Sequence, residues 1–374
     1  MQKIVYISNN GDEDKHLPIM IDLARKATIL RPDVASNWEF LAGHFLLEGK
    51  YEEAIAVLNN ASSKLPTNSK VHLLLAMAYY RARQFERSRE ILDDAPPVPT
   101  DDRETKILRL ELLIRLAARK NELETSIASC QDVLELDPGH TRARYELAIA
   151  LAMLGRSDEA CQLIDLDQFV TVTDLATPEG YENAKAFEAA LVSEISRNPT
   201  LRPDPPGKAT KSGFQTSANL PRAGEQAIST LLSVVQSTVD RFEEGLKERL
   251  DHPFVAGRPK RARVKAWAVV YPGDGYQTPH IHPNSWLSGV YYVSMPKSFG
   301  DDSNSGHLVL GTVERAGLTT APPWGIRNIL PITGRLVMFP SYVPHATIPT
   351  RSTAERVCIS FDVVPARSDP NAGA

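Results

Sequence analysis

The side chains most able to do chemistry lie in the second half of the chain. His280 and His282 are separated by one residue, so both point the same way if the segment is a β-strand. His345 follows, and Arg356 lies eleven residues after it. If a hairpin turns near residues 350–351, His345 and Arg356 face each other across it. A metal ligand beside a fixed cation suits a small molecule that chelates metal at one end and carries a carboxylate at the other.

These residues lie in a region whose hydrophobic pattern has a period of two. The pattern predicts short strands at residues 264–271, 279–282, 287–294, 307–310, 336–339 and 357–363. Strands of this number, with turn signals between them, favour a double-sheet jelly roll. In the last strand Arg356, Cys358, Ser360 and Asp362 share one face while apolar side chains share the other. The polar face is expected to line a site.

The first part of the chain is of a different kind. Residues 1–165 contain 7 of the 27 prolines and 5 of the 21 glycines, which indicates a helical region poor in helix breakers. Large and small residues recur there at about 34 residues, the period of tetratricopeptide repeats. One well-formed copy contains Trp38, Ala42, Phe45, Gly49, Tyr51, Ala54, Leu58, Ala61 and Pro66. We expect about four repeats, stacked so that neighbours bury a shared core.

The fold predicted from these patterns is therefore α+β and multidomain, with a helical repeat solenoid followed by a jelly roll. We place the repeats at 1–165 and a support region at 166–262, with a short strand at 169–172 and helices at 182–197 and 221–250. The jelly-roll core is placed at 263–366 and a disordered tail at 367–374. Because the repeats carry no metal-ligating motif, a chain without residues 1–165 is expected to keep a folded barrel.

Composition excludes several classes of protein. Lys and Arg number 42 against 46 Asp and Glu, a net charge of −4, so nucleic acid is not an expected partner. We find no signal peptide and no apolar run long enough to span a membrane, so no membrane association is expected. Three isolated cysteines, Cys130, Cys161 and Cys358, argue against a disulfide framework and favour the reducing cytoplasm.

Longer motifs surround the histidines and the arginine. They read HIHPNSWLSGVYYV at 280–293, GRLVMFPS at 334–341 and RVCISF at 356–361. With His345, these motifs resemble the 2-oxoglutarate and Fe(II)-dependent oxygenase superfamily, over roughly residues 165–366. The resemblance implies Fe(II) as the metal and 2-oxoglutarate as the cosubstrate. It also implies that His280 is the first iron ligand, His345 the distal ligand, and Arg356 the clamp for the far carboxylate of 2-oxoglutarate.

The sequence departs from the superfamily at His282, which stands where an aspartate is usual. His282 could complete a three-histidine site, Asp301 or Asp302 could supply the third ligand, or water could occupy that position. Tyr271, Tyr292 and Ser360 alternate onto faces that could look into the barrel. Because superfamily members often hold the cosubstrate carboxylate with a Tyr or Ser hydroxyl, these three are candidate cosubstrate-binding residues. Trp267 is assigned to core packing.

The function implied is that of a 2-oxoglutarate-dependent dioxygenase, a hydroxylase. By analogy with prolyl and aspartyl/asparaginyl hydroxylases that join repeats to this barrel, its substrate would be a peptide or protein recruited by the repeats. Two alternatives remain. The protein could be a scaffold for protein–protein interaction whose barrel has lost catalysis, which His282 would explain. It could instead be a three-histidine cupin-like dioxygenase that does not use 2-oxoglutarate, against which Arg356 argues.

Overall fold

The computed structural model describes residues 13–205, 207–247, 249, 251–296, 304–314, 318 and 322–366. The expected tail at 367–374 lies outside these residues. The chain divides into two compact units, residues 1–136 and residues 137–374. This division falls earlier than the end of the repeat pattern at residue 165, so the last helical pair belongs to the second unit.

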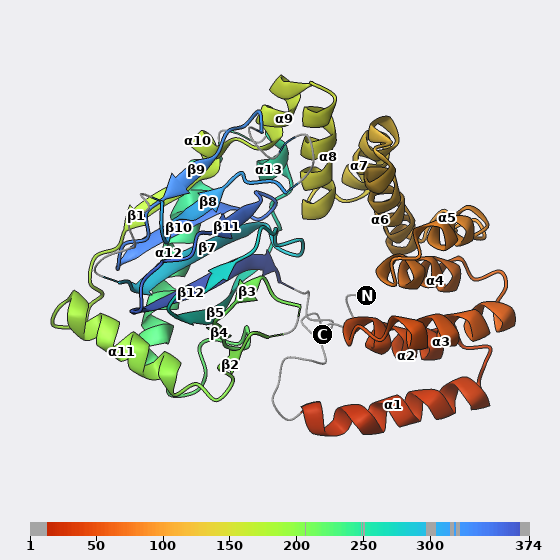
Figure 1. The fold of residues 1–374 in the computed structure, drawn as a ribbon, viewed down its shortest axis with the longest axis horizontal. Coiled ribbons are helices and arrows are strands. Elements are labelled where there is room, and N and C mark those ends of the chain that lie inside the picture. The colour runs from red at the N-terminus through yellow and green to blue at the C-terminus, as the bar shows by residue number, and fades with distance from the viewer. Residues whose placement is uncertain are drawn as a thin grey trace, which may run out of the picture. The chain divides into compact units, whose positions relative to one another are not determined.

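The first unit is built of antiparallel helices (Figure 1). They are α1 (Glu13–Leu30), α2 (Ala35–Leu47), α3 (Tyr51–Lys64), α4 (Ser69–Arg81), α5 (Phe85–Asp93), α6 (Arg103–Lys120) and α7 (Leu123–Leu136). Fully buried Ala42 and Ala54 let α2 and α3 approach closely, while Trp38 and Leu58 fill the space between them. Three helix pairs follow α1, as the repeat pattern predicts.

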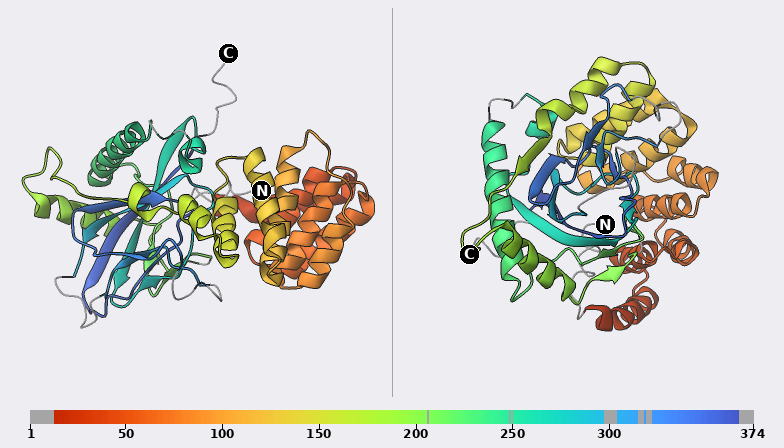
Figure 2. Two further views of the ribbon diagram at one scale, coloured as in Figure 1. Left: turned by 90° about the horizontal axis from the view of Figure 1, so that it is seen from above. Right: turned by 60° about the vertical axis from the view of Figure 1, so that its left-hand side comes forward.

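The helices of the second unit are α8 (Thr141–Met153), α9 (Ser157–Leu163), α10 (Leu166–Phe169), α11 (Ala184–Ser196), α12 (Gln226–Gly245) and α13 (Pro253–Ala256). The long α12 buries one apolar face, including Ile228, Leu231, Val235 and Val239. Figure 2 shows α12 running along the outer side of the strands. The helix expected at 221–250 is shorter in the structure, where it begins at Gln226 and ends at Gly245.

Two facing sheets and a two-stranded ribbon form the rest of this unit. A seven-stranded sheet has the order β1-β10-β7-β12-β5-β4-β2, a three-stranded sheet the order β11-β8-β9, and β3 pairs with β6. The strands are β1 (Thr171–Asp174), β2 (Arg202–Pro203), β3 (Thr210–Lys211), β4 (Phe214–Gln215), β5 (Ala262–Pro272), β6 (Tyr276–Gln277), β7 (Leu287–Ser294), β8 (Leu308–Leu310), β9 (Arg327–Ile329), β10 (Arg335–Pro340), β11 (His345–Thr347) and β12 (Glu355–Pro365). The described pairings are antiparallel. The predicted α+β class is confirmed.

Two local predictions are wrong. Residues 279–282 do not form a strand, and only an isolated bridge joins His280 to His345. His345 and Arg356 do not share a hairpin either, since β11 pairs with β8 in the small sheet and β12 pairs with β5 and β7 in the large one. The residues between β11 and β12 cross from one sheet to the other. His345 and Arg356 therefore approach the same space from facing sheets.

Helices α8 and α9 form hydrogen bonds with the loops that carry the histidines. Thr141 Oγ1 donates to the carbonyl of Ser285 at 2.7 Å, and the Tyr342 hydroxyl donates to the carbonyl of Leu163 at 2.8 Å. The buried Arg144 donates to the carbonyl of Pro253 at 2.7 Å, and its guanidinium lies 5.2 Å from the centre of the Tyr342 ring. The last helical pair thus braces the segments just after His282 and just before His345. In the part of the chain that the structure describes, no helix is long and apolar enough to cross a membrane.

The contacts of α8 and α9 change the expectation that a chain without residues 1–165 keeps a stable barrel. We predict that a fragment of residues 166–374 is less stable than a fragment of residues 137–374. The shorter fragment loses α8 and α9, so Tyr342 and Ser285 lose buried hydrogen-bond partners, each worth about 1 to 3 kcal/mol. Circular dichroism and thermal unfolding of both fragments measure the difference. Equal melting temperatures would show that α8 and α9 are dispensable.

Candidate metal centre and cosubstrate pocket

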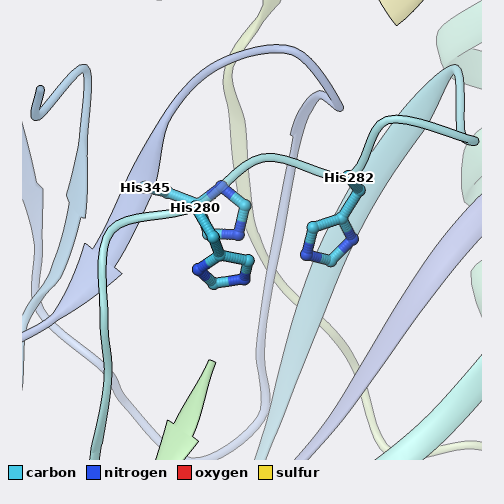
Figure 3. Close-up of side chains that lie close together, drawn as sticks. All are labelled: His280, His282 and His345. Carbon is cyan, nitrogen blue, oxygen red and sulfur yellow. The ribbon is translucent and has the colours of Figure 1, made fainter. Parts of the chain in front are cut away.

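Three imidazoles converge where the two sheets meet (Figure 3). One ring nitrogen from each of His280, His282 and His345 lies within 4.8 Å of the others. The backbones of His280 and His345 exchange two hydrogen bonds of 3.0 Å, and His282 N donates to the carbonyl of Ser341 at 2.9 Å. These bonds hold the segment 280–282 against the segment 341–345. The missing strand at 279–282 is thus replaced by pairing with the segment that carries the third histidine.

Each imidazole is fixed by an oxygen beside its Nδ1 atom. The carbonyl of Thr278 lies 2.7 Å from Nδ1 of His280, and the carbonyl of Val343 lies 3.0 Å from Nδ1 of His345. A carboxylate oxygen of Asp362 lies 2.6 Å from Nδ1 of His282. Carbonyls and carboxylates only accept, so each Nδ1 carries the proton and each neutral ring has its lone pair on Nε2. Three converging imidazole lone pairs suit a divalent transition metal such as Fe(II).

The surroundings favour the neutral rings that a metal needs. Burial, followed by the nearby His282, lowers the pKa of His280 to about 4. Burial, followed by His280 and His282, lowers the pKa of His345 well below its ordinary value. Neutral imidazole is the form that binds a metal. At neutral pH His280 and His345 are therefore ready to act as ligands without first losing a proton.

Asp362 lies directly behind His282, on the polar face of β12 that was expected to line a site. Its Oδ1 atom also accepts a hydrogen bond of 2.7 Å from Ser288, whose hydroxyl contacts that of Ser341 at 2.8 Å. Burial raises the pKa of Asp362, but its interactions with His282 and hydrogen bonds from Ser288 and Ser285 outweigh burial, so the pKa lies below its ordinary value. The negative charge is thus carried by Asp362, which contacts His282, and not by a side chain at position 282 itself. Asp301 and Asp302, the other candidates for a third ligand, lie outside the described residues.

A cavity extends from the histidines to Arg356. Its lining includes His282, His345 and the four predicted cosubstrate residues, Tyr271, Tyr292, Arg356 and Ser360. The side chain of Arg356 is 1% exposed and donates from Nη1 to the carbonyl of Gly306 at 3.0 Å. Its Nε atom and the hydroxyls of Tyr271 and Tyr292 have no hydrogen-bond partner among the described residues. No ion pair joins Arg356 to a carboxylate in the described part of the chain.

Unpaired buried polar groups of this kind are rare in native proteins and indicate a missing partner. The guanidinium of Arg356 lies 5.7 Å from the ring centre of Tyr271 and 5.5 Å from that of Tyr292. Burial is the main cause that raises the pKa of both tyrosines, so both hydroxyls keep their protons and can donate. One cation and two hydroxyl donors therefore surround a position that fits a carboxylate. The residues present fit 2-oxoglutarate as well as Fe(II).

The sequence analysis did not predict the place of Trp267 in the cavity or the contact of Asp362 with His282. Trp267 lines the cavity, and its ring centre lies 5.7 Å from that of His282, whereas core packing was expected. Asp362 had a signal, since it alternates with Arg356 and Ser360 on the polar face of the last strand. By contrast, Trp286 and Trp324 are buried and donate to the carbonyls of Phe254 and Gly311, as structural residues do.

Comparison with known families agrees with this geometry. Residues 265–362 match the family model described as "Putative 2OG-Fe(II) oxygenase". This segment of the chain thus matches a 2OG-Fe(II) oxygenase domain. Residues 45–111 and 129–162 match two tetratricopeptide repeat models, so the oxygenase domain is joined to such repeats. The family's cofactor is Fe(II) and its cosubstrate is 2-oxoglutarate, as the sequence motifs implied. No curated protein sequence matches the chain.

Several solved structures are similar to parts of the chain. A prolyl-4-hydroxylase from Pseudomonas putida has 16% identity and a TM-score of 0.37, covering 57% of this chain and 100% of its own. A prolyl hydroxylase from Trichoplax adhaerens, in complex with a hypoxia inducible factor peptide fragment, has 16% identity and a TM-score of 0.38, covering 56% and 91%. YrrB, a TPR protein with an unusual peptide-binding site, has 17% identity and a TM-score of 0.33, covering 46% and 83%.

The contact between His282 and Asp362 predicts different Fe(II) affinities for two variants of the protein. His282→Asp places a second carboxylate beside Asp362, so repulsion between like charges should weaken metal binding. In the double variant His282→Asp/Asp362→Asn this repulsion is absent, and we expect metal affinity about tenfold or more above that of the single variant. Anaerobic calorimetry with Fe(II) measures both constants, and Asp174→Asn is the control at an exposed carboxylate.

Equal Fe(II) affinities in the single and double variants would show that Asp362 does not act on position 282.

The lowered pKa of His280 predicts a pH dependence of the metal-free protein. Between pH 6.5 and pH 4 the unfolded chain binds a proton at residue 280 and the folded protein does not, so this contribution to stability is lost as the pH falls. Between pH 7 and pH 5 the free energy of unfolding should therefore drop by about 2 kcal/mol more in the wild type than in His280→Gln. Urea denaturation at both pH values gives the comparison, and equal drops would contradict burial of a neutral His280.

Proposed function

We propose that the protein is an Fe(II)- and 2-oxoglutarate-dependent hydroxylase whose substrate is a peptide or protein. The observation that carries the proposal is Arg356, a buried guanidinium whose Nε lacks a partner at the opposite end of a cavity from His282 and His345. A buried cation with no carboxylate beside it is unfavourable unless a ligand supplies one. A molecule with a keto acid at one end and a carboxylate at the other satisfies both ends of this cavity.

His280, His282 and His345 would hold the iron through their Nε2 atoms. When bound, Fe(II) and 2-oxoglutarate together activate dioxygen, so that 2-oxoglutarate is oxidised to succinate and carbon dioxide while one oxygen atom is inserted into the substrate. Asp362 orients His282 and places its negative charge near the metal, which offsets the lack of a carboxylate ligand. The protein would thus contribute by positioning the iron and by placing a negative charge near it.

The other residues of the cavity would bind and enclose the cosubstrate. Arg356 would contact its far carboxylate through Nε, with the hydroxyls of Tyr271 and Tyr292 as further donors. Ser360 lies on the same face of β12 as Arg356, nearer the histidines, where its hydroxyl would serve the middle of the cosubstrate. Leu308 and Phe339 line the cavity with apolar surface, which keeps water from the reacting groups.

A peptide or protein substrate is supported by the two matched repeat segments. Stacked helical pairs of this kind present extended surfaces on which partners bind. The first unit supplies no group of metal-ligating side chains among its described residues, since the one such group in the described chain is that of the three histidines. The division of labour is therefore recruitment by the repeats and chemistry in the oxygenase domain.

The three-histidine set also favours a second candidate, a cupin-like dioxygenase that does not use 2-oxoglutarate. Such an enzyme has no use for a buried, unpaired Arg356 at the far end of the cavity. Succinate formation distinguishes the candidates, because only the 2-oxoglutarate-dependent enzyme releases it. A scaffold without catalysis would produce no succinate and would not need the three ordered Nε2 lone pairs.

We predict that Arg356→Ala weakens 2-oxoglutarate binding by about thirtyfold or more, since truncation of a buried charged partner costs roughly 2 to 5 kcal/mol. Arg356→Lys should recover only part of the affinity, because an ammonium does not reproduce the planar fork of a guanidinium. Fe(II) affinity should stay near that of the wild type. Anaerobic calorimetry measures both ligands, with the exposed Arg351→Ala as the matched control. An unchanged 2-oxoglutarate dissociation constant in Arg356→Ala, or a loss in Arg351→Ala instead, would overturn the assignment.

A further inference from the structure

The face of β5 that lines the cavity continues beyond it with basic side chains. Strand residues alternate between faces, and Trp267 and Tyr271 both line the cavity. Arg263 and Lys265 occupy the same face of the strand, since the pairing of β5 with β12 runs without a bulge from residue 262 to residue 272. Lys265 is half-buried and Arg263 is exposed. The inner face of β5 is thus apolar and aromatic within the cavity and positively charged outside it.

The order of the cross-strand pairs places these charges relative to the metal centre. Tyr271 lies opposite Arg356, Trp267 opposite Ser360, and Lys265 opposite Asp362. Asp362 contacts His282, so the histidines lie at the level of the last of these pairs. With a rise of about 3.3 Å per residue, Arg263 is roughly 13 Å along the strand from Trp267. Along β5, the proposed 2-oxoglutarate clamp therefore lies on one side of the metal centre, Lys265 lies at its level, and Arg263 lies beyond it.

A third basic residue comes from a neighbouring loop. Lys208 precedes β3, whose Thr210 pairs with Gln277 of the cavity lining, and Thr278 N donates to the carbonyl of Ala209 at 3.1 Å. Lys208 is exposed and lies two residues before Thr210. Burial, followed by the charges of Arg263 and Lys208, lowers the pKa of Lys265.

No ion pair satisfies Lys208, Arg263 or Lys265 among the residues that the structure describes. The carboxylate facing Lys265 from β12 is that of Asp362, and its Oδ1 atom is already engaged by His282 and Ser288. Like charges held together at the edge of a partly dry cavity repel one another, and an anionic ligand relieves that repulsion. The three side chains, here named the basic rim, carry three positive charges against the single carboxylate of Asp362, which Lys265 shares with His282.

We propose that the basic rim of Lys208, Arg263 and Lys265 binds carboxylate side chains of an acidic peptide segment beside the substrate residue that enters the metal centre. The inference rests on the proposed function and narrows its substrate class. The rim spreads along a strand and a loop rather than closing around one point, which suits an extended chain with several acidic residues better than a single small anion. Along β5 the basic rim lies at and beyond the level of the metal centre, toward the end of the strand away from Arg356.

The test uses the full chain loaded anaerobically with Fe(II) and 2-oxoglutarate. Three fluorescein-labelled pools of synthetic peptides share one degenerate centre and differ in their flanks, which are Asp/Glu, Ser/Gly or Lys/Arg. Fluorescence anisotropy should show the acidic pool binding at least tenfold more tightly than the neutral pool. Arg263→Glu and Lys265→Glu should each lower that affinity at least fivefold, whereas the matched control Lys185→Glu on α11 should leave it unchanged. Since Lys265 is half-buried, the exposed Arg263→Glu keeps the test independent of any folding defect.

Equal binding of the acidic and neutral pools, or unchanged affinity in Arg263→Glu, would overturn the proposal. Competition by 1 mM inorganic phosphate that abolishes acidic-pool binding would also overturn it in favour of a small-anion site. Failure of the proposed function is seen separately, because a wild-type chain that does not bind 2-oxoglutarate in the presence of Fe(II) fails before any peptide is added.

Discussion

The site depends on three oxygen atoms, each of which lies beside the Nδ1 atom of one histidine. The carbonyls of Thr278 and Val343 and the carboxylate of Asp362 hold the imidazoles of His280, His345 and His282 in a single tautomer. Without these contacts each ring could turn or exchange its proton, and the Nε2 lone pairs would not converge. Two of the oxygens belong to the backbone two residues before the histidine concerned, so local chain geometry fixes those rings.

The third oxygen ties the metal centre to the rest of the domain. Asp362 lies on β12, the strand that also carries Ser360 and Arg356 into the cavity. One strand of the large sheet therefore places Asp362 behind His282 and Arg356 in the same cavity. The small sheet supplies His345, and α8 and α9 brace the segments just after His282 and just before His345. The last helical pair thus belongs physically to the oxygenase domain although its sequence follows the repeat pattern.

The sequence predicted the elements better than their connections. Periodicity placed β7 at its observed bounds, and the 34-residue pattern located the helical pairs, because both signals arise from local burial. It could not show that β11 and β12 belong to different sheets, since pairing partners depend on packing between distant segments. The histidines His280 and His282 still point together, but through a bridge to His345 rather than through a strand.

The same limit applies to the site residues. The four predicted cosubstrate residues line one cavity because alternation along the three paired strands β5, β12 and β7 is local and regular. Asp362 was visible on the polar face of the last strand, yet its contact with His282 joins residues eighty positions apart. We predicted core packing for Trp267 because an aromatic residue in a strand usually packs in the hydrophobic core. No local sequence feature distinguishes an aromatic residue that borders a candidate metal centre.

The proposed function depends on the binding of Fe(II) by the three histidines and of 2-oxoglutarate by Arg356. The most direct measurement is an anaerobic titration of the full-length protein with Fe(II) and then 2-oxoglutarate, followed by visible absorption. The account predicts a weak charge-transfer band that saturates at one 2-oxoglutarate per chain and is absent in His280→Ala. Tight Fe(II) binding with no band at saturating 2-oxoglutarate would contradict it.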